Sequence, residues 1–174
     1  MSLNVKRVIF LIEIILLFYL LYLIYNLSNV CDAFSIEHFR LADENDKSNF
    51  DPKLKELHDK LKPMFADNVE YNGILEGINR KRVLNELSLY KGDKSYTINK
   101  ENIYLCLKDE NDKYYNDMML IYVLLHEVSH SLCNEIGHTE KFTKIFKALL
   151  DKATQMKIYD PSVQIIRNYC SYKK

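Results

Sequence analysis

The stretch HEVSH, residues 126 to 130, contains residue types that bind metal ions and move protons. On an α-helix, residues four positions apart lie on the same face, so His126 and His130 can direct two imidazole nitrogens at one point about 2.1 Å from each. Glu127 lies about 100° round the helix from His126, where its carboxylate can reach a water molecule on the same ion. The pattern predicts a catalytic zinc site with Glu127 as general base.

The third zinc ligand must come from outside this motif, because a catalytic zinc ion usually takes three protein ligands and keeps its fourth position for water. Glu135, His138 and Glu140 follow the motif closely enough to supply it. Gly137 can end the helix and turn the chain, which would bring His138 back toward the ion. We therefore expect His138 to complete a site for one zinc ion per chain. Glu140 remains an alternative ligand, although an acid there also suits a helix N-terminus.

The cysteines are further potential metal ligands. None of the four, Cys31, Cys106, Cys133 and Cys170, forms a C-x-x-C pair, which argues against a zinc ribbon or a redox motif. Cys133 lies one turn after His130 on the ligand face and could approach the metal, which would close the site and make it structural. A buried inert thiol, or a disulfide with Cys106 or Cys170, is the commoner outcome for such a residue.

The helices that position these side chains follow from the spacing of apolar residues. Residues 116–134 are apolar nearly all round, which predicts a helix buried in the centre of the domain. Residues 51–63 predict an amphipathic helix with Asp51 as N-cap and Pro52 at its first position, and residues 139–153 predict a third helix. In the buried helix, two histidines and a glutamate would be destabilising by several kcal/mol unless they shared a function.

Four short runs between the first two helices are rich in β-forming residues: NVEYNG, VLNELSLY, SYTIN and NIYLCLK, within residues 68–108. The sequence KGDK between the second and third runs predicts a hairpin turn. These strands and helices together predict an α+β fold with a small, mostly antiparallel sheet packed on the buried helix.

The N-terminal part of the chain has a different character. Residues 8–27 are almost entirely apolar and, at about 1.5 Å per residue, long enough for a transmembrane helix. Lys6 and Arg7 precede this segment and acids follow it, which predicts a cytosolic N-terminus at residues 1–7. Residues 28–50 are then a polar tether, and residues 51–174 form a domain on the opposite side of a single-pass membrane anchor.

The overall charge narrows the class of partner. The 174-residue chain carries 24 basic and 24 acidic residues, so its formal net charge is zero. A protein that binds nucleic acid normally presents a basic surface, and none is indicated here. We expect a protein or peptide substrate and contact with a lipid bilayer through residues 8–27, and no nucleic acid; the sequence does not indicate the oligomeric state.

The segment LLHEVSHSLCNEIGHTEKFTKIFKALL resembles the SprT/WLM-like minimal zinc metallopeptidases, whose motif is H-E-x-x-H, a short spacer, a third His and a Phe, here Phe142. With SYTINKENIYLCLKDEN before it, the chain is similar to small membrane-anchored members carried by large DNA viruses, over about residues 80 to 153. The metzincin pattern does not fit, because it requires Gly and His where Cys133 and Ile136 stand. The resemblance implies a compact minimal zincin core of the α+β class, with NIYLCLK as the strand at the edge of the cleft.

The resemblance implies a membrane-anchored zinc metalloendopeptidase, a hydrolase in which Glu127 takes the proton of a zinc-activated water. The viral likeness makes a virion membrane one candidate location. The alternative is a catalytically silent zincin-fold membrane protein in which the metal is structural or the fold serves binding; a helical membrane adaptor without metal is a third reading. The acid at Glu127 favours the enzyme, since a structural site has no use for it. Tyr169 is a candidate oxyanion donor or a packing aromatic.

Overall fold

The computed structural model describes Leu16, Leu17, Tyr19, Leu20, Tyr22, Arg40, Leu41, residues 50–166, Tyr169 and Cys170. The chain divides into two units, Met1–Glu37 and His38–Lys174. In the first unit the described residues are helical and exposed. The second unit is a small α+β structure that contains the HEVSH motif.

The predicted transmembrane helix over residues 8–27 is corrected by the structure. No helix among the described residues is long and apolar enough to cross a bilayer. The helical residues described within the predicted span are Leu16, Leu17, Tyr19, Leu20 and Tyr22. The single-pass membrane location rested on that helix and is corrected with it. The rest of the predicted span, the predicted N-terminus 1–7, Cys31 and most of the predicted tether 28–50 lie outside the described residues.

The helices of the second unit agree in part with the predictions. They are α2 (Pro52–Leu61), the 3-10 turns η1 (Lys62–Phe65) and η2 (Gly73–Leu75), α3 (Arg80–Asn85), α4 (Asp117–Leu132) and α5 (Glu140–Gln155). Asp51 caps α2 as expected, because its carboxylate accepts the Lys53 N–H at 2.9 Å. Helix α3 is a correction, since the run VLNELSLY was predicted to be a strand throughout. Asn79 caps this helix by accepting the Arg82 N–H.

The sheet differs from the prediction in its topology. Strands β1 (Arg40–Leu41), β2 (Ser88–Lys91), β3 (Tyr96–Ile98) and β4 (Asn102–Leu105) lie in the order β1-β2-β4-β3. The β1–β2 and β2–β4 pairs are parallel and only β3–β4 is antiparallel, so the mostly antiparallel sheet was wrong. A parallel neighbour is reached by a crossover that leaves no local turn signal in the sequence, which explains the error.

The hairpin lies one turn further along the chain than predicted. The segment KGDK joins β2 to β3, which are not neighbours in the sheet. The tight turn joins β3 to β4 through Asn99 and Lys100, which have positive φ angles of 52° and 60°. The Glu101 N–H closes this turn by donating to the Ile98 carbonyl at 3.1 Å, and positive φ at both central residues suits the twist of the flanking strands. Strand β3 therefore occupies the edge of the sheet, where NIYLCLK had been expected, and β4 lies inside it.

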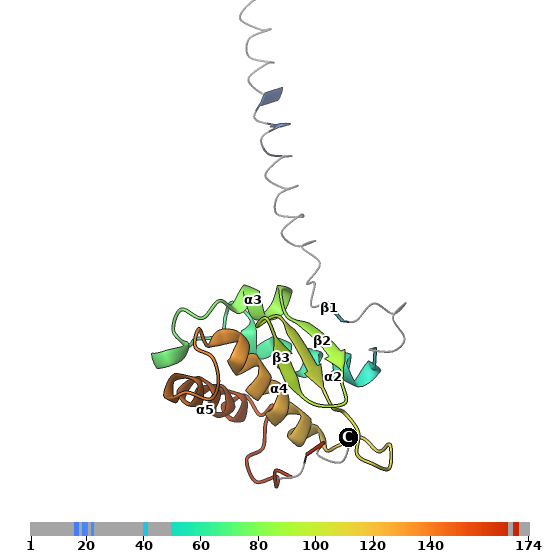
Figure 1. The fold of residues 1–174 in the computed structure, drawn as a ribbon. Helices are drawn as coiled ribbons and strands as arrows, with labels where there is room; N and C mark the ends of the chain where they lie inside the picture. The colour runs from blue at the N-terminus through green and yellow to red at the C-terminus, as the bar shows by residue number, and fades with distance from the viewer. Residues whose placement is uncertain are drawn as a thin grey trace, which may run out of the picture. The chain divides into compact units, whose positions relative to one another are not determined.

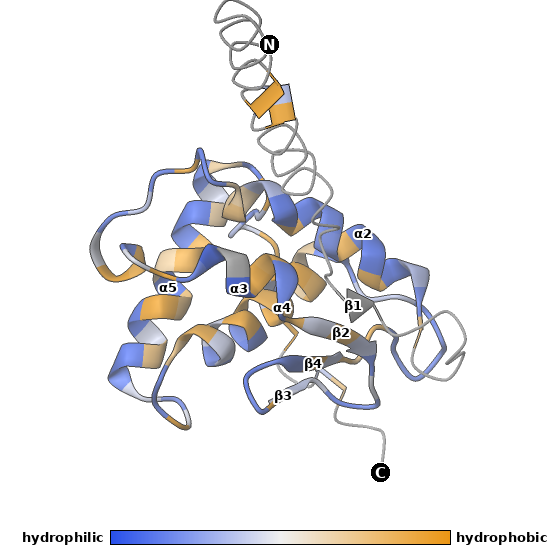
Figure 2. Ribbon diagram, turned by 90° about the horizontal axis from the view of Figure 1, so that it is seen from above, coloured by the Kyte–Doolittle hydropathy of each residue, from blue (hydrophilic) through white to orange (hydrophobic). Residues whose placement is uncertain are grey.

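Helix α4 is the centre of the hydrophobic core. Figure 1 shows α5 on one side of α4 and the sheet on the other, and α4 also contacts α2. Its residues Leu120 and Leu125 are fully buried and pack with Leu57 of α2, Leu149 of α5 and Ile103 of β4. Figure 2 shows hydrophobic residues over most of this helix. A helix that is apolar over most of its surface must be covered over most of its surface, as the sequence indicated.

Candidate metal centre

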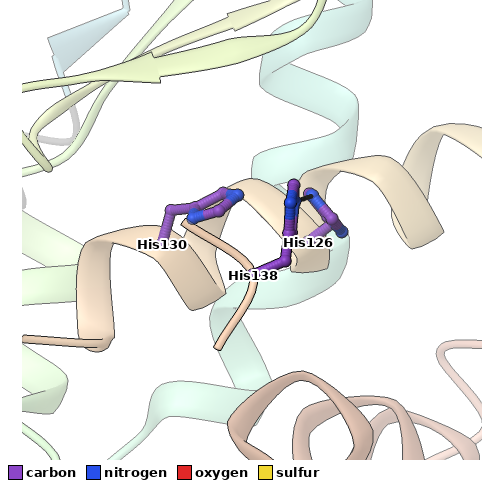
Figure 3. Close-up of side chains that lie close together, drawn as sticks. All are labelled: His126, His130 and His138. Carbon is purple, nitrogen blue, oxygen red and sulfur yellow. Dashed lines mark hydrogen bonds between the residues drawn. The ribbon is translucent and has the colours of Figure 1, made fainter. Parts of the chain in front are cut away.

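Three histidines from two adjoining parts of the chain converge at the surface of α4. His126 and His130 lie on one face of the helix, and His138 reaches the same place from the loop that follows it (Figure 3). One ring nitrogen of each lies within 4.8 Å of those of the other two. The Nε2 atoms of His126 and His138 are 2.9 Å apart. The structure thus brings together the three residues that the sequence singled out as ligands.

The loop after α4 explains how His138 returns to the helix. Helix α4 ends at Leu132, two residues earlier than predicted, and its C-cap Cys133 is extended. Gly137 has a φ of +84°, a conformation that favours glycine, directly before His138. Thr139 then begins α5 by accepting the Phe142 N–H with its side chain at 3.3 Å. The chain therefore reverses within a few residues, and α5 packs back along α4.

The ring of Phe142 packs against all three histidines. Its side chain is buried, and its ring centroid lies 4.2 Å from that of His130 in a stacked arrangement. The centroids of His126 and His138 are each 4.9 Å from it, edge to face. Because one rigid ring contacts all three imidazoles, their orientations are limited by packing as well as by the backbone. The Phe of the resembled motif thus has a physical role here.

The environment favours the neutral forms of His126 and His130. Burial, helped by the neighbouring imidazoles of His130 and His138, lowers the pKa of His126 to about 4. Burial also lowers the pKa of His130, and His138 and Lys100 act in the same direction. Only a neutral imidazole has a lone pair for a metal ion, so these shifts favour metal binding over protonation near neutral pH.

Glu127 lies next to the histidines and is tied to the edge of the sheet. Its side chain is 5% exposed, and the hydroxyl of Thr97 in β3 donates to its Oε2 at 2.7 Å. Burial raises the pKa of Glu127, and the Thr97 hydrogen bond opposes that rise. A carboxyl whose pKa is raised is a stronger base when ionised, which suits proton transfer near neutral pH.

Strand alternation explains why Thr97 faces the helix. Its neighbours Tyr96 and Ile98 are 43% and 41% exposed and therefore lie on the opposite face of β3. Tyr96 stacks there on Tyr104 of β4, which in turn stacks on Tyr90 of β2. The aromatic stack fixes the register of the outer face, and Thr97 is left to point at Glu127.

Lys100 connects the β3–β4 turn to the loop that carries His138. Its Nζ donates to the backbone carbonyl of Cys133 and, at 3.3 Å, to that of Glu135. These carbonyls come directly after the end of α4, where backbone acceptors lack helical partners and attract a cation. The turn thus holds the beginning of the ligand-bearing loop against the sheet.

The other sequence candidates lie outside the histidine cluster. Glu140 is exposed and forms an ion pair with Lys144 at 2.6 Å, and Glu135 is exposed on the loop. Cys133 is a buried free thiol, while Cys106 forms a disulfide with Cys170. The hydroxyl of Tyr169 donates to the backbone carbonyl of Cys106, directly after the end of β4.

Sequence reasoning missed Thr97, Lys100 and the pairing of Cys106 with Cys170. Thr97 lies in the run SYTIN, which was assigned to a strand, but nothing local says which face meets α4. Lys100 is one lysine among many on a polar turn. The disulfide joins residues 64 positions apart, and such pairing cannot be deduced from spacing.

A hollow of about 560 Å³ opens over the histidines. One wall is β3 with its turn, and the other is the loop from Glu135 to His138. His126, Glu127 and His130 lie at its base. A chemical group placed there is in reach of the three imidazoles and of the Glu127 carboxylate together.

Comparison with known proteins gives viral relatives. Uncharacterized protein 136R of Invertebrate iridescent virus 6 is 45% identical over 104 residues, 58% of each chain. Uncharacterized protein 042R of Invertebrate iridescent virus 3 is 44% identical over 100 residues, 57% of this chain and 63% of that protein. Uncharacterized protein R325 of Acanthamoeba polyphaga mimivirus is 33% identical over 116 residues, which are 63% of this chain and 58% of that protein.

The chain thus matches less than two thirds of the length of each of these relatives. No family model matches the chain, and no solved structure matches it significantly. The names of the relatives state no activity.

Proposed function

We propose that this chain is a zinc-dependent peptidase that hydrolyses peptide bonds of a protein substrate. The observation that carries the proposal is the convergence of His126, His130 and His138, with ligand atoms within 4.8 Å of one another, beside the buried carboxyl of Glu127. A structural zinc site is normally closed by four protein ligands, whereas three histidines leave one position open. A buried acid adjacent to an open site is the arrangement that hydrolysis requires.

The donor set fits zinc on chemical grounds. Three neutral imidazoles are borderline-soft nitrogen ligands, which zinc accepts, whereas magnesium and calcium prefer oxygen. The three histidines form the ligand group without Cys133, Glu135 or Glu140. When bound, the ion would polarise the scissile carbonyl and lower the pKa of a water molecule to about 7.

The protein residues then handle the proton. Glu127 accepts a proton from the attacking water as the new C–O bond forms, and it delivers that proton to the amine nitrogen as the C–N bond breaks. Thr97 holds one oxygen of the carboxylate at 2.7 Å, which fixes the orientation of the group.

Strand β3 offers a way to hold the substrate. It pairs with β4 on one side and lines the hollow over the histidines on the other. An extended peptide can pair with such an edge through its backbone, largely independently of sequence. This role had been expected of NIYLCLK, and the structure gives the edge position to β3 instead.

The test uses the full chain, purified with zinc, beside Glu127→Gln and a control, Glu110→Gln, which changes an exposed acid. We expect one zinc ion per chain in all three proteins by elemental analysis. Cleavage of an unfolded protein should fall by about a hundredfold or more in Glu127→Gln alone, since a general base contributes at least that much.

The other outcomes separate the alternatives. Zinc in the wild-type protein without cleavage of any unfolded substrate would favour a metal with a structural or binding role. Correctly folded protein without zinc would exclude the metal centre altogether.

A further inference from the structure

A second hollow of about 560 Å³ adjoins the metal centre on the side away from the His138 loop. It shares His126, Glu127 and Ser95 with the first hollow, so these residues lie between the two. A bond positioned over His126 and Glu127 would have one flank of the peptide in each hollow. Histidines and residues of the β3–β4 turn line much of the first hollow. Most of the residues that line the second are apolar or aromatic, and Lys94 lies at it as well.

One wall of the second hollow is formed by α4. Met119, Tyr122 and Val123 line it, and they precede His126 by seven, four and three residues. This spacing places them on the same helix face as the proposed ligands. Met119 and Val123 are nearly fully buried in the core, so this wall is rigid.

The opposite wall is the C-terminal segment, by which we mean Val163–Ile166 with Tyr169 and Cys170. Ile165 and Ile166 line the hollow; Ile165 packs against the core and Ile166 is 48% exposed. The segment has no helix or strand among its described residues to hold it in place. Its position depends on side-chain links to the rest of the domain.

Those links concentrate at its end. Cys170 is joined to Cys106, directly after β4, by the disulfide. The Tyr169 hydroxyl donates to the Cys106 carbonyl and lies 3.0 Å from the Ser95 Oγ, and the ring of Tyr169 packs on Tyr115 at 4.8 Å. The Cys170 N–H donates to the Tyr115 hydroxyl at 3.3 Å. The wall is thus anchored to the sheet beside the metal centre.

From this geometry we propose that the second hollow is a subsite for one large apolar side chain of the substrate, next to the bond that is cleaved. This inference rests on the proposed peptidase function and names its substrate class: extended peptides with a residue such as Leu, Ile, Met or Phe at that position. An apolar side chain there is removed from water against Tyr122 and the two isoleucines. A polar side chain of the same shape would lose hydration where it contacts Tyr122, Ile165 and Ile166, which offer few hydrogen-bond partners.

The experiment measures binding separately from cleavage. Glu127→Gln full-chain protein with zinc, labelled at its isoleucine methyl groups, is titrated with two short Gly/Ser peptides that differ only in one central Leu or Asn. Leu and Asn have nearly the same shape, so the comparison isolates polarity. We expect the Leu peptide to bind about tenfold more tightly and to shift the methyl signals of Ile165 and Ile166, with Ile74 unmoved.

The variants test the wall itself. Ile166→Asp should abolish the preference for Leu, and Ile166→Ala should reduce it, while Ile74→Asp, which changes a partly exposed isoleucine in η2, should leave it intact. Equal binding of the two peptides, or a Leu preference that Ile166→Asp does not change, would overturn the subsite.

Cleavage of the same two peptides by the wild-type protein is then measured. If the Leu preference in binding holds and depends on Ile166 but the zinc-loaded wild-type protein leaves the peptide intact, the peptidase proposal fails and the apolar binding site stands. Cleavage at a fixed position beside Leu, with the Asn peptide cut about tenfold more slowly, supports both.

Discussion

At the scale of single residues, the hydrogen bond from Thr97 to Glu127 controls how readily the acid ionises. It is the contact that opposes the effect of burial on the pKa of Glu127. Thr97→Val keeps the shape and the strand preference but removes the donor. We expect the pKa of Glu127 to rise further and the acidic limb of the kcat/KM profile to move to higher pH. At about pH 6 the rate should fall about tenfold, with zinc content unchanged.

Thr143→Val is the matched control for this substitution. The Thr143 hydroxyl donates to the Thr139 carbonyl at 3.0 Å within the first turn of α5, on an exposed surface. The kcat/KM profile of the Thr143→Val protein should coincide with that of the wild-type protein. An unshifted acidic limb in a folded, zinc-loaded Thr97→Val protein would show that Thr97 does not act on Glu127.

The low pKa of His126 predicts an acid-sensitive metal-free protein. Its pKa is about 6.5 in the unfolded chain and about 4 in the fold. Between these values the unfolded chain binds a proton that the folded chain does not. The free energy of unfolding therefore falls as the pH falls from about 6.5 to about 4, and is unaffected by this group above that range.

Urea unfolding in a chelator, at about pH 7 and about pH 5, measures this effect. We expect the metal-free wild-type protein to lose about 1 kcal/mol more stability between these conditions than His126→Gln, a figure reduced because the ring is partly exposed. An equal loss in both proteins would mean that His126 is not the group that resists protonation.

The candidate site shows which residue-level features a sequence reveals. His126 and His130 are fixed by helical spacing alone, and His138 follows from a turn at Gly137 that the structure contains. Thr97 and Lys100 touch the site only because β3 lies at the sheet edge against α4. That placement depends on strand order, which is set by contacts distant in the sequence.

At the scale of elements, the β3–β4 turn acts on the metal centre through Lys100. Removing its charge by Lys100→Met should free the loop that begins at Cys133 and carries His138. Because partners that orient metal ligands typically contribute tenfold or more to affinity, we expect zinc to bind about tenfold more weakly in a chelator competition assay.

Lys55→Met is the control for this effect. Lys55 forms an ion pair with Asp59 at 2.6 Å on the surface of α2, away from the centre. Its zinc affinity should equal that of the wild-type protein. If both variants bound zinc equally well, the contacts of Lys100 with the loop would have no part in holding His138.

The elements themselves were predictable where the signal is local. Asp51 followed by Pro52 fixes the start of α2, and apolar spacing locates α4 and α5 within two residues at each end. The run VLNELSLY was predicted as a strand because its residues favour strands. Its first three residues belong instead to the short helix α3, which Asn79 caps. The hairpin was assigned to KGDK rather than to Asn99–Lys100 because KGDK contains the glycine that usually marks a hairpin.

At the scale of the whole molecule, the disulfide between Cys106 and Cys170 joins the end of β4 to the C-terminal segment. It closes a loop across 64 positions, which restricts the unfolded chain. Reduction should lower the free energy of unfolding of the wild-type protein by about 2–4 kcal/mol in urea titrations.

The double variant Cys106→Ser with Cys170→Ser provides the comparison. It should unfold like the reduced wild-type protein and should not respond to a reducing agent, which also controls for effects on the buried thiol of Cys133. A variant as stable as the oxidised wild-type protein would show that the link does not contribute to stability.

The three proposed ligands have a further consequence because they occupy only residues 126 to 138. Closing so short a segment round an ion loses little chain entropy, even before the domain has folded. The unfolded chain can therefore compete with the folded one for zinc, and ligand binding to both states weakens the stabilisation that mass action provides. Zinc should raise the melting temperature of this protein less than its affinity alone would imply, and a newly made chain can acquire its metal before β1 and β2 have paired.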